Sequence, residues 1–162
     1  MIRAVSVAAI LSLCCFAAKA QTVSVQVLNQ GGAQAVLAAA VRNAQARHAP
    51  SAIAVVDPAG DLLVFERMDG VRPASVELAI QKARTAARLQ RPTAEIEDNI
   101  NHGRTAFVTA DIPALQGGMP ISVDNHVIGA VGVAGLSKEN DTEISGVAAQ
   151  ALSSPQSSSA PN

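Results

Sequence analysis

The chain has 162 residues, of which 49% are hydrophobic and 15% charged, and this excludes a disordered protein, whose composition combines low hydrophobicity with high net charge. Aromatic residues make up only 2% and the formal net charge is −1, so the chain lacks the stacking platforms and the basic surface of a nucleic-acid-binding protein. A chain of this length is expected to form about one domain.

The first 20 residues have the features of a secretory signal peptide. Arg3 supplies the positive charge, residues 5–18 form an apolar run, and residues 18–20 read A-K-A, a small-residue cleavage site. The run is shorter than the roughly 18 apolar residues expected of a membrane span. We therefore expect a periplasmic or secreted protein that keeps no membrane span after cleavage. Cleavage after Ala20 also removes both cysteines.

Residues 21–152 are predicted to form the domain, and the Ser/Pro-rich residues 153–162 a disordered tail. The valines of residues 23–27 alternate with polar residues, as in a strand. Residues 34–48 carry apolar side chains at a helical period, with Asn29 or Gln30 as the expected start. Residues 52–67 form two β-rich runs around a Pro- and Gly-containing turn, which predicts a hairpin.

The second half of the chain also contains helices and a hairpin. A helix is predicted over residues 73–89, and a short helix follows from Thr93 to about His102. A loop then leads to strands at residues 120–123 and 127–134, and a last helix covers residues 139–152. This order predicts one antiparallel sheet with helices packed on it, not a doubly wound parallel sheet.

Three segments carry a resemblance to a known family. The first segment covers residues 54–70 and ends E-R-M-D-G. The second begins at Ala74, contains K-A-R-T-A, and ends with R-P-T at residues 91–93. The third begins with G-G-M-P-I at residues 117–121, continues through the glycine-rich residues 127–135, and ends at the acidic stretch around Asp141. Together they resemble the GlcG/HbpS family of haem-binding-like proteins, which includes the C-terminal domain of PduO-type proteins. The match covers roughly residues 30–152.

The resemblance implies an α/β (α+β) fold, a profilin-like sandwich in which a five-stranded antiparallel sheet carries helices on both faces. It also implies a homo-oligomer, a dimer or a higher even number of subunits. The cofactor it implies is a b-type haem held without a covalent bond, because characterised relatives bind haem. Covalent attachment is excluded, since the chain contains no C-x-x-C-H sequence.

The glycine loop is the first candidate for ligand binding. Gly117 and Gly118, followed by Pro120, allow backbone N–H groups to approach a carboxylate closely, as in other glycine-rich anion sites. The alternative is a sharp loop that needs positive φ before a strand. The pattern leaves both interpretations open.

Lys82 and Thr93 are the remaining candidates. The resemblance implies that the second helix lies beside the ligand pocket, where Lys82 would pair with an acidic group; a solvated surface lysine is the alternative. The family resemblance also suggests Thr93 as a residue near the haem. The charges of Arg88 and Arg91 at the helix end are explained by the helix dipole.

No metal site is predicted. Secreted haem-binding relatives carry an iron-binding E-x-x-E pair on the second helix, whereas this chain has Glu77 followed by Ile80. No zinc-type spacing occurs, and the three histidines, His48, His102 and His126, are predicted at helix ends or in a turn, as structural or solvated residues.

The main hypothesis is therefore reversible, non-covalent capture of haem or a related tetrapyrrole. One alternative is a small-molecule catabolic enzyme of isomerase or lyase type that uses Lys82 and the Gly117–Gly118 loop. Another is an oligomeric interaction or sensor module. The shape of the pocket discriminates among them: a polar cleft around Lys82 favours the enzyme, and a filled interface between sheet and helix favours the interaction module.

Overall fold

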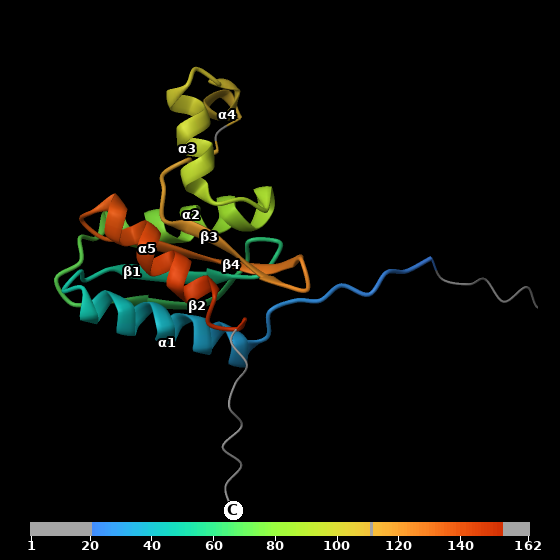
Figure 1. Ribbon diagram of the computed structural model, residues 1–162, viewed down its shortest axis with the longest axis horizontal. Helices are drawn as coiled ribbons and strands as arrows, with labels where there is room; N and C mark the ends of the chain where they lie inside the picture. Colours follow the sequence, from blue (N-terminus) through green and yellow to red (C-terminus); the bar gives the residue numbers. More distant parts are fainter. Residues whose placement is uncertain (1–20, 111, 154–162) are drawn as a thin grey trace, which may run out of the picture.

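The computed structural model describes residues 21–110 and 112–153. The predicted signal peptide and nearly all of the predicted tail lie outside this range. The elements run in chain order as follows: α1 (Gln30–Ala46), β1 (Ala52–Val56), β2 (Leu62–Arg67), α2 (Ala74–Leu89), α3 (Thr93–Asn101), α4 (Ala106–Thr109), β3 (Gly118–Val123), β4 (His126–Ala134) and α5 (Lys138–Ala149) (Figure 1). In the described part of the chain, no helix is long and apolar enough to cross a membrane.

The four strands form one antiparallel sheet in the order β2-β1-β4-β3. Central strands β1 and β4 pair in continuous register, with Ala52 opposite Ala134 and Val56 opposite Ala130. All five residues of β1 are buried, as expected of a strand covered on both faces. The two predicted hairpins and the antiparallel arrangement are thus confirmed.

The expected fifth strand is absent, and the prediction for residues 23–27 is wrong. The structure assigns no strand to residues 21–29, and Val23, Val25 and Val27 are 86%, 68% and 59% exposed. The chain first meets the sheet at Leu28, whose backbone N–H donates to the Ile128 carbonyl over 2.8 Å. Alternation makes a segment suitable for a strand, but a strand also requires a neighbour along its length.

Helices cover both faces of the sheet. Odd-numbered residues of β1, such as Ile53 and Val55, pack with buried side chains of α1 and α5, while even-numbered residues pack with α2. This is the consequence of the period of two in a strand, which turns successive side chains to opposite faces. α1 begins where the sequence predicts, because the Asn29 side chain accepts a hydrogen bond from the Gly32 N–H.

The contact between α2 and the sheet is made by small side chains. The cluster contains alanines from the helix, including Ala79, Ala83 and Ala86, and alanines from β1 and β4. At Gly132 an added Cβ would collide with the backbone of α2, at the Ala79 carbonyl and the Ala83 nitrogen. The glycines of β4 that interrupt the strand therefore serve close packing of helix against sheet at this point.

α3 and α4 project away from the sheet (Figure 1). α4 is a single turn within the segment that the sequence predicts as a loop. The chain returns from this projection along residues 112–117 to β3, passing beside α2. Ile112 and Pro113 of the returning segment form part of one wall of the groove described below.

Candidate ligand site

Lys82 is buried and paired. Its Nζ donates to Asp141 Oδ2 over 2.9 Å and to the Val133 carbonyl over 2.8 Å, and the Lys82 and Asp141 side chains are each 6% exposed. The other carboxylate oxygen of Asp141 accepts the Gly135 N–H over 2.7 Å. The pair therefore joins α2, the end of β4 and the first turn of α5.

The glycine loop lies against Lys82. Gly117 has φ +111°, and a Cβ there would lie 2.7 Å from the Val133 carbonyl and 3.0 Å from Lys82 Nζ. A Cβ at Gly118 would collide with the backbone carbonyl of Lys82. Both positions need glycine because the loop crosses α2 and the buried ion pair at contact distance.

Thr93 joins the same group. It is fully buried at the start of α3, its Oγ1 accepts the Gly118 N–H over 2.8 Å, and its hydroxyl lies 3.4 Å from the Gly118 carbonyl, to which it donates. Pro120 lies two residues further along β3, opposite Ala130. The structure thus brings Lys82, Thr93, Gly117 and Gly118 together in one closely packed junction. Their role in ligand binding stays a prediction.

Asp141 is the residue of this junction that sequence reasoning missed. Its place in the first turn of a helix already has a local explanation, since carboxylates are favourable there. The usable signal was Lys82, a lysine among alanines on a buried helix face, which implies a buried carboxylate partner.

Two small cavities flank the junction. One, of about 160 Å³, is bordered by Lys82, Leu115 and Gln116, and the other, of about 110 Å³, by Ser51 and Asn140; Asp141 borders both. Sites for drug-sized ligands usually measure about 300–1,000 Å³. Neither cavity accommodates a tetrapyrrole, and no broad polar cleft surrounds Lys82 in the described residues.

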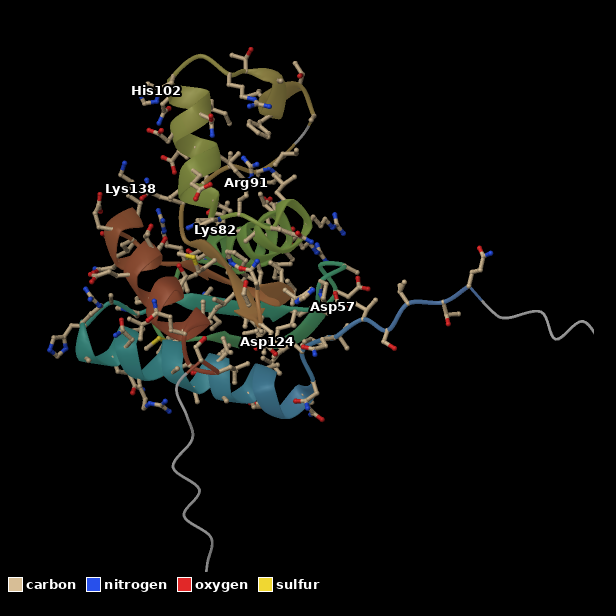
Figure 2. All side chains as sticks on the ribbon, turned by 45° about the vertical axis from the view of Figure 1, so that its right-hand side comes forward. Asp57, Lys82, Arg91, His102, Asp124 and Lys138 are labelled. Atoms are coloured by element: carbon tan, nitrogen blue, oxygen red, sulfur yellow. The ribbon has the colours of Figure 1, made fainter. Side chains whose placement is uncertain are left out.

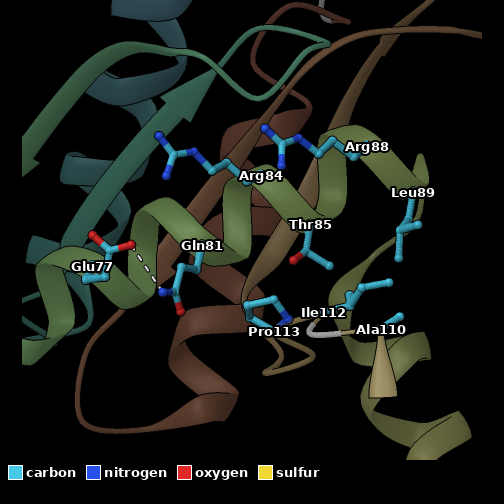
Figure 3. A pocket seen from close by; sticks show the side chains of 9 residues that line it. All are labelled: Glu77, Gln81, Arg84, Thr85, Arg88, Leu89, Ala110, Ile112 and Pro113. Carbon is cyan, nitrogen blue, oxygen red and sulfur yellow. Dashed lines mark hydrogen bonds between the residues drawn. The ribbon is translucent and has the colours of Figure 1, made fainter. Parts of the chain in front are cut away.

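A larger groove of about 490 Å³ runs along the outer face of α2, opposite Ala110, Ile112 and Pro113 (Figure 3). The helix contributes side chains spaced one turn apart, and Thr85 points toward Ile112 and Pro113 on the facing wall. The sequence did not indicate this facing wall, because a loop carries no periodic pattern. The lining residues are Glu77, Gln81, Arg84, Thr85, Arg88, Leu89, Ala110, Ile112 and Pro113.

The groove has apolar and charged parts. Leu89, Ile112 and Pro113 supply aliphatic surface, whereas Arg84 and Arg88 lie at the edge nearest the β1–β2 turn. Arg84 Nε donates to the Gly60 carbonyl over 3.1 Å, and Arg88 Nε donates to the Ala59 carbonyl over 2.9 Å. Arg88, which the helix dipole alone explained at the level of sequence, is therefore part of the groove.

The groove offers aliphatic and charged surface, but no axial ligand for a haem iron. A haem presents a flat apolar body and two carboxylates, which match the aliphatic wall and the two arginines. None of the residues lining the groove is a histidine, methionine, cysteine or tyrosine, the common axial ligands. His102, for example, lies at the far end of α3 (Figure 2). No group of three or more potential metal ligands occurs among the described residues.

This combination defines a small α+β protein in which helices cover both faces of one antiparallel sheet and a groove runs along one helix. Residues 28–150 match the family model described as "Haem degrading protein HbpS-like", and the chain belongs to this HbpS-like family. The resemblance stated from the sequence motifs is thereby confirmed.

Two curated relatives place the chain within the family. Protein GlcG of Escherichia coli K12 is 45% identical over 108 residues, which cover 66% of this chain and 81% of GlcG. Corrinoid adenosyltransferase PduO of Salmonella typhimurium LT2 is 31% identical over 119 residues, which cover 70% of this chain and 35% of PduO.

Two solved structures share the fold. The crystal structure of HbpS superposes with a TM-score of 0.75 at 30% sequence identity, covering 82% of this chain and 94% of that one. The structure of a PduOC:haem complex superposes with a TM-score of 0.69 at 29% identity, covering 77% of this chain and 94% of that one. One protein of similar fold has thus been solved with haem.

Proposed function

We propose that this protein binds haem or a related tetrapyrrole, reversibly and without a covalent bond, in the groove along α2. The observation that carries the proposal is the groove of about 490 Å³, which runs along α2 and combines an aliphatic wall with two arginines. Membership of the HbpS-like family and the likeness to a PduOC:haem complex support haem as the ligand.

The residues of the groove have different tasks in this proposal. Leu89, Ile112 and Pro113 cover the apolar body of the ligand and exclude water from it. Gln81 and Thr85 offer polar groups along the floor. A bound haem supplies an iron atom whose chemistry depends on its axial ligands.

The predicted residues Lys82, Thr93, Gly117, Gly118 and Pro120 act indirectly in this proposal. They fix the start of β3 against α2, and the chain reaches β3 from the wall residues Ile112 and Pro113. The distance between the two walls of the groove therefore depends on their packing. The enzyme alternative would require Lys82 to leave Asp141 for a substrate.

The proposal is tested by titrating the chain without residues 1–20 with haemin and following the Soret band. We expect a saturable shift at about one haem per subunit. Gln81→Trp fills the groove and should abolish the shift. Gln45→Trp, the same change at an exposed position of α1, should leave the shift unchanged. Unsaturable absorption, or equal binding by both variants, would refute the α2 groove as a haem site.

Export is a second part of the proposal. The charged, apolar and small-residue segments of residues 1–20 support secretion to the periplasm or beyond. Expression of the full chain in a Gram-negative host, followed by fractionation and determination of the N-terminus, should give a periplasmic protein beginning at Gln21. A cytoplasmic protein that retains Met1 would contradict it.

Assembly into an even-numbered homo-oligomer is the third part. Large apolar side chains at Val108, Leu115 and Leu136 are exposed, and contact with a second subunit would cover such side chains. Light scattering coupled to size-exclusion chromatography should return a mass of two or more subunits, and a monomer at micromolar concentration would contradict this part.

A further inference from the structure

We propose that Arg84 and Arg88 form a carboxylate-binding pair, which selects for the groove a flat apolar ligand with acidic groups along one edge. This inference rests on the proposed function, because it assumes that the α2 groove holds the ligand. The inference goes beyond the proposed function by assigning the ligand's orientation and the residues that recognise its acid groups.

The first argument is that both guanidinium groups are already held in place. Their Nε atoms donate to two consecutive carbonyls of the β1–β2 turn, over 3.1 Å from Arg84 and 2.9 Å from Arg88. The two side chains also pack on Gly60, where an added Cβ would lie 3.2 Å from Arg84 Cγ and 3.0 Å from Arg88 Nε. Ligand binding then immobilises little further side-chain freedom, which favours affinity.

The second argument concerns the charge that remains. Among the described residues, these bonds occupy only the Nε atoms, so the terminal nitrogens have the bidentate geometry that arginine forms with a carboxylate still open to them. Among the described residues, neither Arg84 nor Arg88 lies within 4.0 Å of a carboxylate. Like charges four residues apart on a helix repel, and a bound acid group would remove this repulsion.

The third argument gives the ligand a direction. Glu77 lies two turns before Arg84 along the same helix, and it accepts a hydrogen bond from Gln81 over 3.1 Å. A carboxylate would be repelled from the Glu77 end of the groove and attracted to the arginine end. The apolar body then lies against Ile112 and Pro113, across from α2.

The test compares haemin with its dimethyl ester, in which both carboxylates are neutral. Wild-type protein should bind haemin at least tenfold more tightly, which is the effect of one charge-assisted hydrogen bond. Arg84→Gln and Arg88→Gln should each weaken haemin binding about tenfold and leave ester binding nearly unchanged. The double variant should bind both compounds alike. Arg42→Gln, at an exposed position of α1, is the matched control and should bind both compounds as wild type does.

The comparison of two ligands separates recognition from damage to the fold. Loss of the turn contacts would weaken haemin and ester binding equally, and this result would overturn the assignment. Equal wild-type affinity for both compounds would overturn the carboxylate pair and leave haem binding intact. Binding of neither compound would overturn the proposed function and, with it, this inference.

Discussion

Replacement of Lys82 by methionine tests the buried ion pair directly. Methionine keeps most of the aliphatic length of lysine but leaves the Asp141 carboxylate buried without its counter-charge, although it retains the Gly135 N–H. Removing one partner of a buried pair costs about 3–5 kcal/mol. Because one hydrogen bond to the carboxylate survives, we expect the free energy of unfolding to fall by about 3 kcal/mol. This change lowers the melting temperature by roughly 6–12 °C in a chain of this size.

The assay is urea unfolding followed by circular dichroism, with the Arg47–Glu143 pair as reference. That pair has an N–O distance of 2.6 Å but side chains 30% and 63% exposed, so Glu143→Gln should cost less than about 1 kcal/mol. Changing the buried pair to Lys82→Met with Asp141→Leu should recover much of the loss, since apolar residues often replace a buried pair without cost. A Lys82→Met variant no less stable than Glu143→Gln would refute the reasoning.

Three further predictions concern packing and pH. Gly132→Ala should destabilise by about 1–3 kcal/mol, because its methyl group collides with the backbone of α2; denaturant unfolding measures this. Gly146→Ala should stabilise by about 0.5–1 kcal/mol in the same assay, since the position is helical and the new Cβ would lie 3.9 Å from Met119 Cε, an ordinary van der Waals distance. The Ser137 hydroxyl, followed by the Glu139 backbone, holds the pKa of exposed Glu139 below its ordinary value of 4.5. Because that pKa is depressed in the folded state, the stability it contributes is present above pH 4.5 and is lost as pH falls through the lowered value. Melting curves from pH 7 to 3 should therefore show wild type and Glu139→Gln converging in acid, and a constant difference would contradict this assignment.

The elements of the fold were predictable because their burial is encoded locally. Helical periods located α1 and α2, and the residues of β1 and β4 had the composition of covered strands. The error at residues 23–27 has a physical cause: the alternation of valines specifies which face a strand would bury, but not whether an edge is available to pair with it.

The candidate site was predictable only in part. The family motifs brought together residues that do meet, such as Thr93 and Gly118, which are linked by a hydrogen bond across 25 positions. The role of Asp141 was not predicted because its partner, Lys82, lies 59 residues away, on the other side of the sheet. The positions of Ile112 and Pro113 in the groove were not predicted, because a groove between a helix and a loop forms only in the folded chain and produces no periodic pattern in the sequence.

The small-residue contact between α2 and the sheet restricts how this protein can change its ligand. With alanines on both sides and Gly132 beneath the helix backbone, shortening the side chains of this contact would open little space. In the proposed site, divergence in ligand preference is therefore expected on the outer face of the helix and at Ala110, Ile112 and Pro113. Substitutions there alter the walls of the groove without disturbing the sheet, so a library of variants for new ligands should target those positions first.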